Sequence, residues 1–313
     1  RPMTPEQIHE ARTRRYNATI VYLKKIHSDL MILRVRPDFP RPAYQAGQYC
    51  TLGLGYWEPR LEGCQEEHLT PEDQMRIVRR SYSISCPILE DDRPDQLYDP
   101  SRTDWLEFYI VLVRHNPDGR VPALTPRLFT RQVGDRIQMG EKITGHYTLE
   151  PVHPGDTVVF LATGTGEAPH NAMIWELLRR GHTGRIVSVC CVRYKQDLGY
   201  WDTHQKLMEL YPHYLYLPLT TREPGQTRKV YIQDLISSGE LEERMGQALD
   251  PARTHVYLCG NPKMIGVPQR DKNTGAVTYP QPPGVIEILE KRGFQADIPS
   301  LKRKGNIHFE EYW

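Results

Sequence analysis

In the first half of the chain, short runs of alternating hydrophobic and polar residues are separated by Gly, Pro and Asp. Such runs, without helical periodicity between them, are typical of antiparallel strands. We expect strands at residues 17–23, 30–35, 49–54, 77–85, 106–113 and 136–139. Their spacing predicts an antiparallel β-barrel. A short helix over residues 4–14, with Thr4 as its cap and Pro5 at its first position, is expected before it.

Near residue 150 the pattern changes to strands that alternate with helices. We expect strands at 158–162, 186–192, 214–219, 255–259 and 306–310, and helices at 169–180, 200–210, 231–245 and 284–292. Strand–helix alternation predicts a parallel sheet with right-handed crossovers. The sequence therefore predicts two domains, an antiparallel β-barrel over residues 1–150 and an α/β parallel-sheet domain over residues 151–313.

Three polar stretches interrupt these elements, at residues 55–76, 86–104 and 267–283. The first two are rich in acidic residues and Pro, and the third is rich in Pro, Gly and polar residues. Runs of this composition are usually solvated, so we expect surface loops.

Composition excludes several classes of function. The 313 residues are 39% hydrophobic and 25% charged, with a net charge of +1, which gives no argument for binding nucleic acid or a membrane surface. No apolar run approaches the roughly 20 residues that span a bilayer, and no signal peptide is evident. The six cysteines include no Cys-x-x-Cys pair and no iron–sulfur spacing, and we expect no metal site. This usage fits a reducing compartment, and we expect a cytoplasmic monomer.

Candidate chemistry begins at the end of the strand 77–85. Side chains two apart on a strand share a face about 6–7 Å from each other, so Arg80 and Tyr82 project together. A guanidinium suits a pyrophosphate and an aromatic ring suits stacking on a flat cofactor. Ser83 adds a hydroxyl beside that ring. A solvated Arg and a half-buried Tyr are the plain alternative.

A Gly-rich segment joins the strand 158–162 to the following helix. Gly164 and Gly166 allow a ligand to approach the backbone closely, and Pro169 suits a first helical turn. The helix N-terminus then offers N–H groups and a positive dipole to a phosphate. The segment is not a Gly-x-Gly-x-x-Gly fingerprint because residue 169 is Pro, and a generic turn remains open.

Further polar groups follow the next strands of the same domain. Arg193 ends one strand, Thr221 and Arg222 end the next, and Arg228 lies just beyond. Because ligands bind at the carboxyl ends of parallel strands, these residues suit the extra phosphate of NADP. Cys259 and Gly260 end a further strand, where a structural turn is the alternative.

Taken together, the motifs resemble the ferredoxin/flavodoxin–NADP reductases of the bacterial type. They occur in the order of that family and cover about residues 16–313 apart from the three polar stretches. The matching segments are Arg80–Ser83, Leu106–Val111, Asp118-Gly119, Leu124–Leu128, Gly134-Asp135, Ala162–Pro169, Arg193, Thr221-Arg222, Cys259–Pro262 and Glu310–Trp313.

The resemblance implies FAD and NADP(H) as cofactors and assigns roles to individual residues. In the FAD site, Arg80 binds the pyrophosphate, Tyr82 stacks on the flavin and Ser83 lies near its N5. The other FAD contacts implied are Ser81, Tyr109, Ile110, Val111, Leu124, Thr125 and Thr165, with Trp313 on the flavin's second face. The NADP contacts implied are Gly164, Gly166, Arg193, Thr221, Arg222, Arg228, Cys259 and Gly260. Ser83, Cys259, Glu310 and Trp313 are the residues expected near the reacting rings, where Trp313 gives way to the nicotinamide.

Two residues depart from the family's pattern. Glu167 and His170 stand where uncharged residues are more usual, in and just after the Gly-rich turn. A carboxylate there repels phosphates unless it points away. The stretch 86–104 directly follows the flavin strand and could cover the adenine end of FAD or alter the docking of a partner.

The implied activity is electron transfer between NADP(H) and a one-electron carrier, ferredoxin or flavodoxin, with hydride passing between nicotinamide C4 and flavin N5. Alternatives are an NADH-dependent oxygenase, flavin or cytochrome reductase of the same fold, against which Arg222 and Arg228 argue, and a non-catalytic nucleotide-binding subunit. Basic clusters that could meet an acidic carrier are Arg12, Arg14 and Arg15, Lys24 and Lys25, and Arg34 and Arg36.

Overall fold

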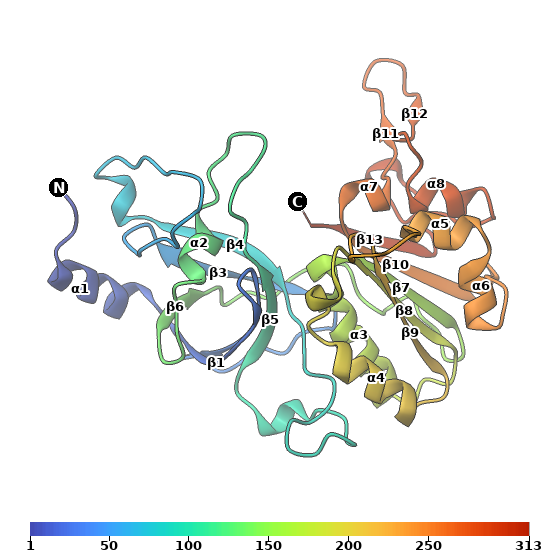
Figure 1. Cartoon of the computed structure of the whole chain (residues 1–313), viewed down its shortest axis with the longest axis horizontal. Helices are drawn as coiled ribbons and strands as arrows, with labels where there is room; N and C mark the ends of the chain where they lie inside the picture. The colour runs from blue at the N-terminus through green and yellow to red at the C-terminus, as the bar shows by residue number, and fades with distance from the viewer. Residues whose placement is uncertain (313) are drawn as a thin grey trace. The chain divides into compact units, whose positions relative to one another are not determined.

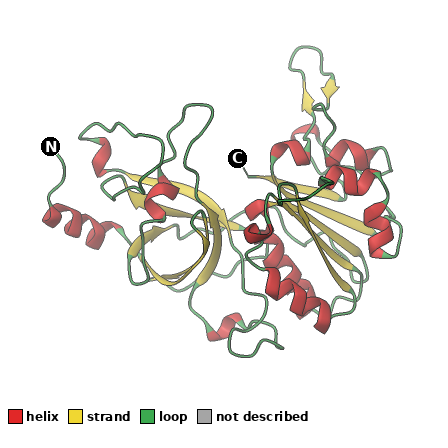
Figure 2. Cartoon of the chain, viewed as in Figure 1, coloured by secondary structure: helices red, strands yellow, loops and turns green. Residues whose placement is uncertain are grey.

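The computed structural model describes residues 1–312, which form two compact units (Figures 1 and 2). The first unit comprises residues 1–87 and 98–146, and the second comprises residues 88–97 and those from 147 onward. The expected domain division at residue 150 stays a prediction. No helix among the described residues is both long and apolar enough to cross a membrane.

The first unit is built on a curled antiparallel sheet. Its strands are β1 (Ala18–His27), β2 (Leu30–Pro37), β3 (Tyr49–Gly55), β4 (Ile77–Ser83), β5 (Leu106–Val111) and β6 (Arg136–Met139), in the order β4-β3-β6-β1-β2-β5. The two edges meet where the Ser85 N–H donates to the Glu107 carbonyl at 2.8 Å. Leu33, Leu52 and Phe108 are fully buried inside. The predicted antiparallel barrel is confirmed.

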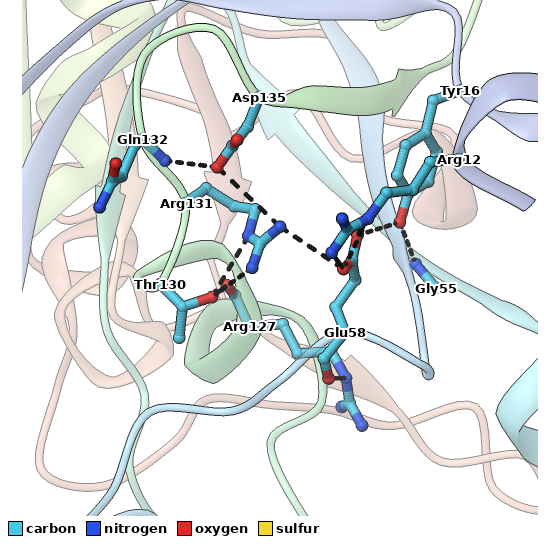
Figure 3. A network of polar contacts seen from close by, with 9 residues as sticks. All are labelled: Arg12, Tyr16, Gly55, Glu58, Arg127, Thr130, Arg131, Gln132 and Asp135. Atoms are coloured by element: carbon cyan, nitrogen blue, oxygen red, sulfur yellow. Dashed lines mark hydrogen bonds and ion pairs between the residues drawn. The ribbon is translucent and has the colours of Figure 1, made fainter. Parts of the chain in front are cut away.

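The N-terminal helix α1 (Pro5–Arg15) is attached to the barrel by an ion pair, and its partly buried Ile8 and Ala11 pack against the barrel core. Thr4 and Gln7 form a capping box, and none of its residues is buried. Arg12 reaches Glu58, whose side chain has no exposed surface (Figure 3). Tyr16 donates to the same carboxylate at 2.8 Å, and Arg131 lies 3.4 Å from it. Glu58 therefore joins α1 to the barrel and to the loop before β6.

The stretch 55–76, expected to be a solvated loop, is anchored by a buried arginine. Arg127 of the short helix α2 (Leu124–Leu128) is 2% exposed. Its guanidinium donates to the carbonyls of Tyr56 at 3.1 Å and Glu58 at 3.2 Å, and it pairs with Glu67. The loop contains the 3-10 turn η1 (Asp73–Met75), and the later stretch 86–104 contains η2 (Pro100–Arg102).

The second unit is a five-stranded parallel sheet with helices on both faces (Figure 2). The strands β7 (Thr157–Thr163), β8 (Ile186–Val192), β9 (Tyr214–Thr220), β10 (Thr254–Gly260) and β13 (Ile307–Glu311) follow the order β13-β10-β7-β8-β9. One face packs against α3 (Glu167–Arg179) and α4 (Trp201–Leu210). The apolar core of the other face includes residues of α5 (Ile232–Ser237), α6 (Glu240–Met245), α7 (Pro262–Ile265) and α8 (Val285–Glu290). The predicted α/β fold is confirmed.

Three local differences from the expected elements have clear causes. The helix expected at 231–245 is two helices, because Gly239 adopts a left-handed φ of 81° between α5 and α6. The stretch 267–283 contains a small hairpin, β11 (Gln269–Arg270) with β12 (Val277–Thr278), which projects from its unit (Figure 1). Ile88 and Leu89 are buried and belong to the second unit, so the stretch 86–104 is not only a solvated loop.

We predict that Glu58→Ala lowers the free energy of unfolding by about 3 kcal/mol, because it leaves the largely buried Arg131 and the Tyr16 hydroxyl without their anionic partner. Urea denaturation of the whole chain measures this. Glu62→Ala, in the same loop but exposed, is the matched control and should change stability by less than about 0.5 kcal/mol. Equal effects of the two substitutions would contradict the anchoring role of Glu58.

Candidate functional site

The first unit places Arg80 and Tyr82 on one face of β4, as the strand spacing predicts. Arg80 and Ser81 are exposed, whereas Tyr82 is half-buried. Burial raises the pKa of Tyr82, so its hydroxyl stays neutral. The Arg80 guanidinium donates to the neighbouring Arg79 carbonyl at 2.8 Å and forms no ion pair within residues 1–312. It is therefore a cation available to an external anion.

Ser83 is the most informative residue of this strand. It is 4% exposed, and its hydroxyl oxygen has no hydrogen-bond partner among the described residues. Buried hydroxyls are usually hydrogen-bonded, so this one can pair with an external polar group. Arg80, Tyr82 and Ser83 together offer a cation, an aromatic face and an unsatisfied hydroxyl.

The remaining residues predicted for this half of the site lie on β5 and α2. Tyr109 and Ile110 are buried, and Val111 is 37% exposed. The Thr125 hydroxyl accepts from the Val113 N–H at 3.0 Å and so ties α2 to the residues after β5, while Leu124 beside it is buried. Since α2 also contacts β4, the fold gathers β4, β5 and α2 around the same end of the barrel.

In the second unit, the Gly-rich turn interlocks with the end of β10. The turn is the 3-10 segment η3 (Gly164–Gly166). A Cβ on Gly166 would lie 2.2 Å from the Cys259 carbonyl oxygen, so a side chain cannot be accommodated there. Gly260, with a φ of 134°, faces Thr163 in the same way, and the Asn261 N–H donates to the Thr163 hydroxyl at 2.8 Å. Thr165 is buried in this turn.

Cys259 and Glu310 are neighbours on adjacent parallel strands. They are register partners in the β10–β13 pair, and the Tyr312 N–H donates to the Gly260 carbonyl at 2.8 Å. Burial, and then the charge of Glu310, raise the pKa of Cys259 well above its ordinary value. The thiol is therefore neutral, and it is not a nucleophile of the thiolate type. Trp313 lies outside the described residues.

The basic residues predicted to meet a phosphate differ in availability. Arg193 and Arg222 follow β8 and β9, and the Arg222 N–H donates to the Arg193 carbonyl at 2.9 Å. Both side chains are exposed and form no ion pair within residues 1–312. Thr221 beside them is buried. Arg228, in contrast, pairs with Glu240 at 3.2 Å.

Glu167 and His170 both point into the interior of the second unit. Glu167 is 1% exposed, accepts from the Tyr216 hydroxyl at 2.8 Å and lies 3.6 Å from His204. His170 is fully buried, and its Nε2 lies 2.7 Å from the Tyr147 hydroxyl. Neither side chain is displayed at the surface. His204, Tyr214 and Tyr216 are not identified from the sequence as members of the buried polar network around Glu167. A signal was present, because Tyr214 and Tyr216 are two apart on β9 and so place two hydroxyls on the same face of the sheet.

His170 should make stability depend on pH. Burial lowers its pKa from 6.5 to about 3. Between pH 3 and pH 6.5, this histidine is therefore protonated in the unfolded chain and neutral in the folded chain. The free energy of unfolding is not reduced by this histidine above pH 6.5. It decreases as the pH falls below that value, by about 2 kcal/mol at pH 5. His170→Gln should flatten unfolding free energy against pH by that amount. His153→Gln, at an exposed histidine, should not; if both curves keep the wild-type slope, His170 is not held neutral.

Comparison with known proteins agrees with this arrangement. Residues 160–270 match the family model of the oxidoreductase NAD-binding domain. The flavodoxin/ferredoxin–NADP reductase of Escherichia coli (strain K12) is 33% identical over 225 residues, which cover 71% of this chain and 76% of that protein. The ferredoxin–NADP reductase of Pseudomonas aeruginosa is 30% identical over 237 residues, covering 72% and 77%.

Solved structures support the fold independently. A ferredoxin NADP+ reductase from Neisseria gonorrhoeae, crystallised with FAD and NADP, superposes with a TM-score of 0.66 at 21% identity and covers 95% of this chain and 98% of its own. The order of motifs, the barrel followed by a parallel sheet and the two curated relatives lead to one conclusion. This chain belongs to the flavodoxin/ferredoxin–NADP reductase family.

Proposed function

We propose that the protein is an FAD-dependent oxidoreductase that transfers electrons between NADP(H) and a one-electron carrier, ferredoxin or flavodoxin. The observation that carries this proposal is the orphaned Ser83 hydroxyl beside the unpaired Arg80 and the half-buried Tyr82. The hydroxyl, the cation and the aromatic ring lie within four residues of one strand, so a single ligand can contact all three. The family membership of the chain supports the same activity.

The residues of the first unit fit FAD. Arg80 supplies a charge-assisted donor for the pyrophosphate, Tyr82 a face for the ring system and Ser83 a hydroxyl for its polar edge. We assign the remaining contacts to Ser81, Tyr109, Ile110, Val111, Leu124 and Thr125. When bound, FAD exchanges two electrons with NADPH as hydride and one electron at a time with the carrier.

The residues of the second unit fit NADP(H). A Cβ on Gly164 would meet nothing within 4 Å, so the backbone there is open to a pyrophosphate. Gly166 and Gly260 instead allow the turn to pack against the end of β10, and Thr165 lines the same turn. We assign the 2′-phosphate to Arg222 and Arg193, with Thr221 beside them, because neither guanidinium must leave a carboxylate to bind it. Arg228 is a weaker candidate, since Glu240 already partners it. This pair of free arginines favours NADPH over NADH.

The residues proposed to lie near the reacting groups are Ser83, Cys259, Glu310 and Trp313. Cys259 offers a neutral, buried thiol that packs without adding charge. Glu310 lies beside it on β13. Hydride transfer itself needs no strong acid or base, which fits the absence of a nucleophile–base pair in this proposal. The gating role of Trp313 stays a prediction.

The surface proposed for the carrier is narrower than the basic clusters of the sequence suggest. Arg12 and Arg34 are engaged with Glu58 and Glu107, and Arg14 pairs with Glu10. Arg15 donates to the Met75 carbonyl. Lys24, Lys25 and Arg36, in contrast, are exposed and form no ion pair within residues 1–312. We propose these three for contact with an acidic carrier. We also propose a cytoplasmic location, which the six free cysteines support, and a monomer.

The purified protein should be yellow, and NADPH should bleach its colour much faster than NADH does. Stopped-flow absorbance under anaerobic conditions measures both rates. A colourless protein that takes up no FAD would refute the flavoenzyme proposal. A preference for NADH would instead favour an oxygenase, flavin or cytochrome reductase of the same fold.

Arg222→Ala should weaken NADP+ binding by about ten- to a hundredfold, the value of a charge-assisted hydrogen bond, and leave NAD+ binding unchanged. Arg228→Ala is the matched control and should have a smaller effect, because Glu240 holds that side chain. Calorimetric titration with both dinucleotides measures the two constants. A larger loss in the Arg228 variant would show that the 2′-phosphate is assigned to the wrong arginine.

A further inference from the structure

The first residue of α3 is a buried acid, directly after the turn Gly164–Gly166. Glu167 is 1% exposed, and its backbone N–H donates to the carbonyls of Gly164 and Thr165. Its side chain turns under the helix toward β8 and β9, where Tyr216 donates to Oε2 at 2.8 Å. A buried charge is costly, so an acid at this position needs a reason beyond packing.

Several elements of the second unit converge on this carboxylate. His204 of α4 lies 3.6 Å from Oε1, and its ring stacks on Tyr216 of β9 with centroids 4.2 Å apart. His204 also contacts the Asn171 amide oxygen at 3.0 Å and the Tyr214 hydroxyl at 2.8 Å. On β8, the Cys190 thiol lies 3.8 Å from the Gly164 carbonyl. The turn is thus connected to both neighbouring strands and both helices of this face.

Glu167 stays an anion in these surroundings. Burial acts to raise its pKa, but the electrostatic interaction with His204 and the hydrogen bond from Tyr216 outweigh it, and the pKa lies below its ordinary value of 4.5. Glu167 Oε1 has no hydrogen-bond partner among the described residues. The negative charge at the start of α3 is therefore only partly compensated.

This charge lies at the end of α3 where an anion is favoured. The positive end of the dipole of a 13-residue helix stabilises a negative group in its first turn. The proposed function, on which this inference rests, assigns the same end to the pyrophosphate of the dinucleotide. Two negative groups then share one dipole, and they repel each other through a poorly hydrated interior.

We propose that Glu167 is a positioning residue that limits how tightly the turn Gly164–Gly166 holds the pyrophosphate of NADP(H). Its hydrogen bond from Tyr216 and its contact with His204 hold the turn against β9 and α4, and its charge weakens the binding of the pyrophosphate. The dinucleotide is recognised mainly through its 2′-phosphate and released readily at its pyrophosphate. Glu167 touches no reacting atom in this role.

The test compares NADP+ with adenosine 2′-monophosphate, which keeps the 2′-phosphate but lacks the pyrophosphate and the nicotinamide riboside, by calorimetric titration. Glu167→Gln keeps an acceptor for Tyr216 but removes the charge. We expect its Kd for NADP+ to fall about three- to tenfold, the size of a charge effect at a helix end, and its Kd for adenosine 2′-monophosphate to stay unchanged. Glu167→Met, which has similar length and no charge, should act in the same direction if the first variant folds poorly.

Two controls separate charge from loosening of the turn. Tyr216→Phe keeps the Glu167 charge and the ring stacked on His204 and removes one hydrogen bond, so its NADP+ affinity should stay within about twofold. Glu176→Gln removes a charge from the same helix about 14 Å further along and should have no effect.

The proposal is overturned if the charge-free variants bind NADP+ no more tightly than the wild type, or if their affinities for both ligands increase equally. It is also overturned if Tyr216→Phe increases NADP+ affinity as much as Glu167→Gln does. A wild-type protein that binds neither ligand would overturn the proposed function itself. Wild-type binding of both ligands with an unresponsive Glu167 would overturn this inference alone.

Discussion

The backbone at Gly166 lies in close contact with the backbone at Cys259. The positions of the polar residues at the carboxyl ends of the second unit's strands, here called the rim, depend on this contact. The position of a Gly166 Cβ lies 2.2 Å from the Cys259 carbonyl oxygen, and that of a Gly260 Cβ lies 2.1 Å from the Thr163 hydroxyl. No side chain fits at either contact. The turn after β7 and the turn after β10 can therefore lie against each other only with glycine at both positions.

This contact determines where the neighbouring chemistry lies. Because β10 is paired with β7 on one side and β13 on the other, fixing its end also fixes Cys259 beside Glu310. On the other side, α3 begins at Glu167, directly after the turn and beside β7 and β8. The Glu167 side chain is buried there, where Tyr216 and His204 contact it. One steric requirement thus explains both the rim and the buried network below it.

Most of the strands and helices follow from local patterns, because each is recorded in consecutive residues. The short, largely apolar run 30–35 predicts β2, and the apolar run 186–192 predicts β8 to the residue. The direction of the Glu167 side chain could not be predicted, since it depends on Tyr216, which is 49 residues away. The burial of Arg127 depends similarly on Glu67, 60 residues earlier. Contacts of this length leave no periodic signal in either partner.

The arginines of this protein serve two different purposes, structural support and ligand binding. Whether an arginine already has a carboxylate partner distinguishes the two groups. Arg34 and Arg127 are buried against Glu107 and Glu67, so bringing an external anion to them would first require breaking an ion pair. Leaving such a carboxylate buried without its cation costs several kcal/mol, on the order of 3–5 kcal/mol. Arg80, Arg193 and Arg222 are exposed and unpaired within residues 1–312, so they bind a phosphate without that loss. The availability of a charge, and not its number in the sequence, therefore identifies the residues suited to bind a dinucleotide.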